Sequence, residues 1–367
     1  MTDKAKLWQS ELEAYIREGE PSRAEKAQAW QTAIGLQDVD GLRPSRYLID
    51  TARQHIEGKI TIDAVQARVH EYYQQRGERR EIEEGEEEAD IVSARIAKIL
   101  GEKAFHFSPA EWCNIHARLF EGVFEGAGKY RTYNITKSEW VLGGSTVLYA
   151  SADMIAQTVE YDFSQERAFS YKGLSKREIA HHVAKFASGI WQIHPFCEGN
   201  TRSTAVFIIK YLGSMGFKVS NEPFEKSSWY FRNALVRANF DDYEKDIHAT
   251  REYLNRFFEN VILGESYELR NRFLHVSWPH NDGMEMGTAS ATDQVSDQVS
   301  DQVKRLLNVM KNGEELSAVE LMGRLGLSHR PTFRKNYLNP ALQAGLVEMT
   351  IPSKPTSRFQ KYRKAQR

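Results

Sequence analysis

This 367-residue chain has few cysteines, no long apolar run and almost no net charge. Its two cysteines are too few for a disulfide framework at this length, which indicates a reducing compartment. No run of about 18 apolar residues occurs, and the N-terminus has no apolar signal region. We therefore expect a soluble, cytoplasmic protein without a membrane span. The formal net charge of −1 gives no overall argument for a polyanionic partner.

The charges are nevertheless unevenly distributed. From residue 304 to the C-terminus, 13 lysines and arginines stand against 4 acidic residues, whereas residues 78–90 contain 8 acids in 13 positions. Runs of like charge repel one another and are usually solvated. Residues 78–90 are therefore predicted to be an acidic linker or the exposed start of a helix, and not a metal site.

Apolar residues at helical spacing dominate the rest of the sequence. Ser108, Pro109 and Glu111 are typical of a helix start, and Gly58 suits a helix end. The pattern predicts helices over 7–17, 24–34, 45–56, 62–73, 91–100, 108–119, 175–193, 203–213, 224–240 and 246–261. Two β-like runs, 133–141 and 145–150, flank a pair of glycines and predict a hairpin.

A polar loop, residues 194–202, lies between two of the most apolar helical runs and reads His-Pro-Phe-Cys-Glu-Gly-Asn-Thr-Arg. Such a loop must leave the core or surround something polar. Gly199 to Arg202 precede a helix start, where N–H groups and the helix dipole favour an anion. Glu198 is a hard oxygen ligand suited to magnesium, and His194 can act as a general base. Together these residues predict phosphoryl or nucleotidyl transfer to a hydroxyl.

At these nine positions the sequence resembles the Fic family, whose signature is His-Pro-Phe-x-Asp/Glu-Gly-Asn-Gly/Lys-Arg. The resemblance implies a mainly α fold, with a Fic-type helical bundle and a small β-hairpin flap. It implies transfer of AMP from ATP, with Mg²⁺, to a Tyr, Ser or Thr hydroxyl of a target protein. His194 would be the base, Glu198 the metal ligand, and the nucleotide phosphates would be held by Gly199, Asn200, Thr201 and Arg202.

Two positions depart from the family pattern. Thr201 stands where glycine or lysine is usual, and Ala205 replaces a second arginine that would reach the γ-phosphate. The histidine and the α/β-phosphate cradle are intact, so these departures concern the orientation of the γ-phosphate and the use of ATP.

The resemblance also implies further contacts with nucleotide and target. Tyr230 and Asn233 would lie near the adenine and ribose, although aromatic residues at helical spacing are more often core. The hairpin would hold an extended target chain by strand addition, as an exposed strand edge can. Alternatively it caps the core. The flap residues are Thr136, Lys137, Ser138, Glu139, Val141 and Leu142.

The N-terminal segment resembles the small helical antitoxin-like module that accompanies Fic domains, on the basis of residues 48–58, Leu-Ile-Asp-Thr-Ala-Arg-Gln-His-Ile-Glu-Gly, and the helix that follows. In that family a Ser/Thr-x-x-x-Glu-Gly/Asn motif can inhibit, and no strict copy occurs here. Glu57-Gly58 is nearest in context. A helical hairpin that packs on the catalytic core, and autoinhibition through Glu57, therefore both stay open.

The C-terminal segment resembles a winged helix, with helices at 317–325 and 330–344 and strands at 346–351 and 358–363. Its basic residues have the charge to hold DNA phosphates, while a protein-docking module with a solvated basic face is the alternative. The candidate DNA contacts are Arg330, Arg334, Lys335, Lys354, Arg358 and Lys361. A linker with a short four-residue repeat precedes this segment.

These patterns give five segments: an N-terminal helical module (1–77), an acidic linker (78–90), a catalytic domain (91–277), a linker (278–303) and a winged-helix-like domain (304–367). Three functions are compatible with them. The first is protein adenylyl transfer, and the second is another Fic-type nucleotidyl or phosphate-group transfer, or AMP removal. The third is a nucleotide-sensing, DNA-bound regulator. The sequence does not determine the target protein or the oligomeric state, and a homo-oligomer is compatible with it.

Overall fold

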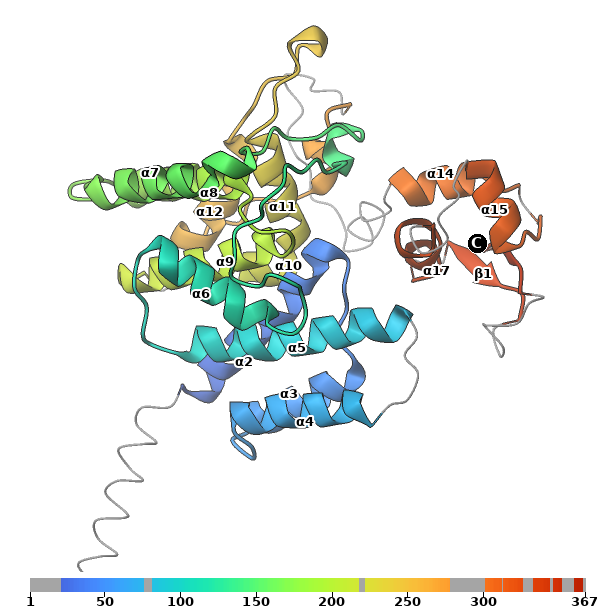
Figure 1. Cartoon of the computed structure of the whole chain (residues 1–367), viewed down its shortest axis with the longest axis horizontal. Coiled ribbons are helices and arrows are strands. Elements are labelled where there is room, and N and C mark those ends of the chain that lie inside the picture. The colour runs from blue at the N-terminus through green and yellow to red at the C-terminus, as the bar shows by residue number, and fades with distance from the viewer. Residues whose placement is uncertain are drawn as a thin grey trace, which may run out of the picture. The chain divides into compact units, whose positions relative to one another are not determined.

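The computed structural model in Figure 1 describes residues 21–75, 81–217, 222–277, 301–311, 313–325, 333–343, 346–351 and 360–365. It is mainly helical, which confirms the expected fold class. The predicted helix at 7–17 and most of the linker and repeat at 278–303 lie outside these residues. The chain divides into two compact units, residues 1–136 with 147–269, and residues 137–146 with 270–367.

The first unit begins with helices whose starts are capped by hydroxyl side chains. The Ser22, Ser45 and Thr61 oxygens each accept a backbone N–H from the first turn of the helix that follows. Gly58, at a φ of 75°, follows the end of the helix that Ser45 caps. The elements are α2 (Arg23–Gly35), η1 (Leu36–Asp40), α3 (Arg46–Ile56), α4 (Ile62–Gln74) and α5 (Glu81–Gly101).

A buried carboxylate ties the α3–α4 hairpin to α5, beside which it lies in Figure 1. Asp90 accepts hydrogen bonds from the Ser45 backbone N–H at 2.7 Å, the Ser45 hydroxyl at 2.5 Å and the Tyr73 hydroxyl at 2.9 Å. Burial raises the pKa of Asp90 to about 6. The acidic segment is thus helical from Glu81, and its last residue is a core residue and not part of an exposed helix start.

The second half of the unit surrounds one central helix, α9 (Asn200–Ser214), which is buried at every position from Asn200 to Leu212. It packs against α5, η1 and two helices that precede it, α6 (Pro109–Phe120) and α8 (Lys176–Ile193). The remaining elements are η3 (Ala152–Met154), α7 (Ile155–Ala168), α10 (Glu222–Lys226), α11 (Ser228–Arg237), η4 (Tyr243–Lys245) and α12 (Glu252–Leu263).

Two predicted helices are shorter than expected. The helix predicted over 224–240 is interrupted at Ser227. Next to this break, the Ser228 hydroxyl donates to the Gly35 carbonyl at 2.7 Å. The helix predicted over 246–261 begins at Glu252. Before it, Asp242 and Ile247 exchange backbone hydrogen bonds and close a tight turn.

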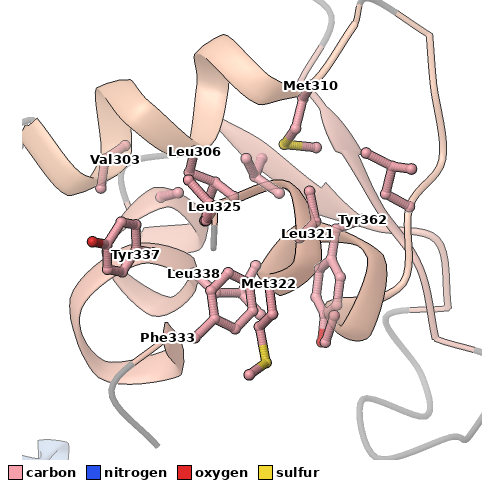
Figure 2. Packing of buried hydrophobic residues seen from close by; sticks show 14 residues of the cluster. Val303, Leu306, Met310, Leu321, Met322, Leu325, Phe333, Tyr337, Leu338 and Tyr362 are labelled. Carbon is pink, nitrogen blue, oxygen red and sulfur yellow. The ribbon is translucent and has the colours of Figure 1, made fainter. Parts of the chain in front are cut away.

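The second unit contains a small helical domain closed by a two-stranded sheet. Its elements are η5 (Asn271–Leu274), α14 (Asp301–Val309), α15 (Ala318–Leu325), the π-helical turn η6 (Arg334–Leu338), α17 (Asn339–Gln343), β1 (Val347–Met349) and β2 (Tyr362–Lys364). The strands are antiparallel, with Glu348 opposite Arg363. Figure 2 shows the core, which consists of Val303, Leu306, Met310, Leu316, Ala318, Leu321, Met322, Leu325, Phe333, Tyr337, Leu338, Ala341, Val347 and Tyr362.

The predicted flap is a chain reversal but not a pair of strands. Glu139 donates its N–H to the Ser145 carbonyl and accepts the Gly144 N–H, each at 2.9 Å, around the short helix η2 (Trp140–Leu142). Both glycines of the turn have positive φ, as a tight reversal requires. Among the described residues, strands occur at β1 and β2 and not in the runs predicted at 133–141 and 145–150.

Side-chain hydrogen bonds explain why the strands do not form. The Lys137 N–H donates to the Thr146 hydroxyl at 3.1 Å, and the Ser138 hydroxyl donates to the Gly144 carbonyl at 3.1 Å. Such local bonds compete with the backbone ladder of a hairpin. The sequence pattern correctly located the turn and was wrong about the ladder.

Candidate active site

The histidine of the polar loop is placed by the helix before it. Helix α8 starts at a reciprocal capping box between Ser175 and Glu178 and ends at His194, whose φ of 50° and ψ of 58° are left-handed. This conformation turns the chain sharply before Pro195. The proline itself disfavours continuation of the right-handed helix through His194. The His194 side chain is buried, with Nδ1 3.3 Å from the Trp191 carbonyl and its ring 4.4 Å from that of Tyr149.

A buried arginine fixes the backbone around this histidine. Arg131 donates Nε to the His194 carbonyl at 2.8 Å, and its own N–H bonds to the Pro195 carbonyl at 2.8 Å. Its other guanidinium nitrogens bond to the carbonyls of Tyr133, Ala150 and Ile193. The loop is therefore held by a charged donor that satisfies several carbonyls at once.

The first turn of α9 holds the other end of the loop. The Asn200 amide donates to the Phe196 carbonyl at 2.8 Å and accepts the Phe196 N–H at 3.0 Å. The Thr201 hydroxyl, which departs from the family pattern, accepts the Trp191 indole N–H at 3.0 Å and so has a structural role here. Gly199 has a φ of 74°, and a Cβ there would lie 2.4 Å from the Phe120 ring. Any side chain at this position would clash with that ring.

Glu198 is exposed at the end of the loop, and its backbone is bonded to a buried histidine. The Glu198 carbonyl lies 2.9 Å from Nε2 of His116, whose Nδ1 accepts the Gly128 N–H at 2.9 Å. Burial lowers the pKa of His116 to about 4. In the part of the chain that the structure describes, no group of three or more His, Cys, Asp or Glu side chains could hold a metal ion. A magnesium ion at Glu198 would therefore also need phosphate and water oxygens, which is its common coordination.

Arg202 points to the N-terminal layer of the unit. Its Nε lies 2.8 Å from Asp40, its Nη2 2.7 Å from Glu88 and its Nη1 3.0 Å from the Gln37 amide oxygen. The guanidinium also lies over the Phe120 ring at 4.8 Å, and the residue is 1% exposed. Its positive charge is thus already balanced by two carboxylates of the same chain.

The other predicted nucleotide contacts are buried in the same unit. Tyr230 is 2% exposed and its hydroxyl donates to the Tyr253 carbonyl at 3.2 Å, while Asn233 is fully buried. Their contact with adenine and ribose stays a prediction. Of the flap residues, Thr136 belongs to the first unit, and Lys137, Ser138, Glu139, Val141 and Leu142 belong to the second.

Several residues at the site were not anticipated from the sequence. His116 of α6 and Arg131 of the segment after α6 bond to the loop. Asp40 and Glu88 pair with Arg202. A single histidine on an apolar helix face carries no sequence signal that would distinguish it from a packing residue. The histidines at 181 and 182 have carboxylate partners, Glu259 at 2.5 Å and Glu166 at 2.7 Å, supplied by other helices.

Two family models match this sequence. Residues 106–212, which include the whole loop with α6, α7, α8 and most of α9, match the Fic/DOC family. The chain carries a Fic/DOC domain. Residues 301–365 match the C-terminal domain of Fic-like proteins, where Fic stands for filamentation induced by cAMP. The Fic/DOC domain thus contains the candidate active site, and a second Fic-associated domain forms the closed core of Figure 2.

Individual proteins with similarity to this chain are distant. A protein adenylyltransferase of Bartonella henselae is 23% identical over 180 residues, 47% of this chain and 31% of the relative. The match thus spans about a third of that relative's length. A Fic family protein from Desulfovibrio desulfuricans is 20% identical in structure-based comparison, covering 93% of this chain and 88% of that one, with a TM-score of 0.38. The ADP-bound Fic domain of a Bartonella quintana effector gives 20% identity, 60% and 87% coverage and a TM-score of 0.36.

The remaining sequence expectations concern membranes and DNA. None of the helices among the described residues has the length and apolar character needed to span a bilayer. Among the candidate DNA contacts, Arg334 and Lys361 are described. The side chains of Arg330, Lys335, Lys354 and Arg358 lie outside the described residues, so DNA contact stays a prediction.

Proposed function

We propose that this protein transfers AMP from ATP to a hydroxyl side chain of a target protein, with His194 as the general base. The similarity to a protein adenylyltransferase and the Fic/DOC family match support this reaction class. The target hydroxyl attacks the α-phosphorus, its proton passes to His194, and pyrophosphate leaves. General-base assistance of this kind contributes about 10²–10⁴-fold to the rate.

The observation that carries the proposal is the environment of His194. When Nδ1–H donates to the Trp191 carbonyl, the lone pair is on Nε2, which is the form a base requires. The backbone of His194 is fixed on both sides, by Arg131 and by the end of α8. A base held in this way needs little rearrangement before it accepts a proton.

The phosphates would lie at the N-terminus of α9. The first N–H groups of any helix have no partner within the helix, and the dipole there favours negative charge. Because the guanidinium of Arg202 is already paired, this cradle would rely on the backbone of residues 199–202 more than on the Arg202 side chain. Glu198 would hold Mg²⁺ together with phosphate oxygens, and the ion would neutralise charge on the triphosphate.

The test uses ATP labelled on the α- or the γ-phosphate, with Mg²⁺, purified protein and a cell lysate. Label from the α-position on protein, absent from the γ-position and lost in His194→Ala, is the expected result. Transfer of γ-label would indicate phosphate transfer instead. ATP binding with no labelled protein from either position would contradict the transferase proposal and favour a nucleotide sensor. Thermal unfolding of His194→Ala checks that the variant is folded.

A further inference from the structure

We propose that His116 is a positioning residue that orients the Glu198–Gly199 peptide so that its N–H faces the nucleotide phosphates. This inference rests on the proposed function, because it assigns a role within the same phosphate cradle. It concerns a residue that lies 82 positions before Glu198 in the sequence and has no counterpart in the loop motif.

The hydrogen bonds of His116 define which ring nitrogen carries the proton. The Gly128 N–H can only donate, so Nδ1 of His116 is the acceptor. The proton of the neutral ring is therefore on Nε2, which donates to the Glu198 carbonyl at 2.9 Å. One imidazole thus connects helix α6, the turn at Gly128 and the polar loop.

This bond determines the direction of the next N–H group. In a planar trans peptide the C=O and N–H point in opposite directions. With the Glu198 oxygen drawn toward His116, the N–H of Gly199 points away from α6. Gly199 is the N-terminal flanking residue of α9, so its N–H extends the set of donors at the end of that helix.

The surroundings hold the imidazole in this position. Its ring is stacked on Phe196, with centroids 3.8 Å apart and an interplanar angle of 22°, and lies 4.7 Å from the Phe120 ring. The residue is 2% exposed. Gly128 approaches so closely that a Cβ would lie 2.6 Å from the Ala117 side chain. A ring packed this tightly holds its partner carbonyl in one orientation, as a supporting residue must.

Two conservative variants separate the two bonds of His116. Asparagine at this position places an acceptor near the Gly128 N–H but is too short to reach Glu198, whereas glutamine carries an amide donor at about the distance of Nε2. We would measure dissociation constants of the full-length protein for ATP, ADP and adenosine, together with thermal unfolding. His182→Asn is the matched control, because His182 is also stacked on a phenylalanine, Phe169, and bonded to a carboxylate outside the loop, Glu166.

His116→Asn is expected to weaken ATP and ADP binding by about 10–100-fold, the size of effect that losing the hydrogen bond behind a metal ligand has on metal affinity. Adenosine, which has no phosphate, should bind both proteins equally, and His116→Gln should keep most of the wild-type affinity. Equal losses for adenosine and ATP, or equal losses in Asn and Gln, would show that His116 only packs. The same would follow if ATP affinity did not change while the unfolding temperature fell as in His182→Asn.

The labelling assay with α-labelled ATP separates this inference from the proposed function. If the wild type labels no protein but ATP affinity depends on His116 as described, the transferase proposal fails and the role of His116 stands. The opposite outcome is a wild type that labels protein, with ATP affinity and labelling rate unchanged in His116→Asn. In that case the transferase proposal stands and the role of His116 fails. A wild type that binds no ATP would overturn both.

Discussion

Arg202 belongs to the segment expected to hold phosphates, yet its side chain is paired with carboxylates from the N-terminal part of the chain. A guanidinium that is 1% exposed cannot remain without partners, because an isolated buried charge is costly. The three contacts also hold the first turn of α9 against η1 and α5. At the scale of one residue, the motif arginine therefore connects the loop to the N-terminal layer.

Substitution of this arginine should strongly destabilise the fold. We expect Arg202→Gln to lower the free energy of unfolding by about 3 kcal/mol, since it removes the cation that Asp40 and Glu88 share. Urea denaturation followed by circular dichroism measures this difference. Arg46→Gln is the control, because Arg46 pairs with Asp50 at the surface and its loss should be below about 1 kcal/mol. Similar losses in the two variants would contradict a structural role for the Arg202 contacts.

Asp90 should make stability depend on pH. Burial raises its folded-state pKa to about 6, above the ordinary value of 3.8. Between these values the folded protein binds the proton more tightly than the unfolded chain, so this group adds stability as the pH falls from 6 toward 4. Asp90→Asn cannot titrate. The stability of the wild type relative to Asp90→Asn should therefore rise by roughly 2–3 kcal/mol between pH 7 and pH 4.

Urea denaturation of both proteins at several pH values gives this difference directly, and other titrating groups cancel in the comparison. A difference that does not change with pH would show that Asp90 titrates normally in the folded protein.

At the scale of elements, helix starts with a local capping signal were predictable from the sequence. Ser108, Pro109 and Glu111 predicted the start of α6, and the Ser108 hydroxyl accepts the Glu111 N–H as expected. Local chemistry decides such boundaries, so the sequence contains them. The break at Ser227, by contrast, lies beside a hydrogen bond to a carbonyl of a distant helix. In the flap, side-chain hydrogen bonds take the place of the backbone bonds between two strands. Neither has a signature in periodicity.

One carboxylate joins the helices that carry the loop. Glu166 of α7 is buried and accepts hydrogen bonds from Tyr171 and, at 2.7 Å, from the Tyr211 hydroxyl of α9, and it also pairs with His182 of α8. We expect Glu166→Ala to lower the free energy of unfolding by about 2–4 kcal/mol, because it leaves buried donors without an acceptor.

Glu160 provides a control on the same helix, since its ion pair with Arg167 is exposed. Glu160→Ala should change stability by less than about 1 kcal/mol. Thermal unfolding of the two variants beside the wild type makes the comparison. Equal shifts in unfolding temperature would mean that the Glu166 bonds do not hold the three helices together.

At the scale of the whole molecule, the sequence predicted the helical class, the polar loop and the paired strands near the C-terminus, because each is encoded by neighbouring residues. It did not predict the partners of Arg202, which are 165 positions away at Gln37 and 114 positions away at Glu88. Likewise, residues 137–146 belong to a unit with residues 270–367, and Val276 donates its N–H to Val141 at 2.9 Å. Contacts between residues so far apart in the sequence form only once the chain has folded.

The closed core in Figure 2 implies that the C-terminal domain folds by itself. A fragment of residues 301–367 should therefore show one cooperative unfolding transition, as small single domains do. In that fragment Leu321→Ala should lower the free energy of unfolding by about 2–5 kcal/mol, because Leu321 is fully buried on α15. Val319→Ala, on the same helix but 70% exposed, should change it by less than about 0.5 kcal/mol. A fragment without a cooperative transition, or equal effects of the two substitutions, would show that this core needs the rest of the chain.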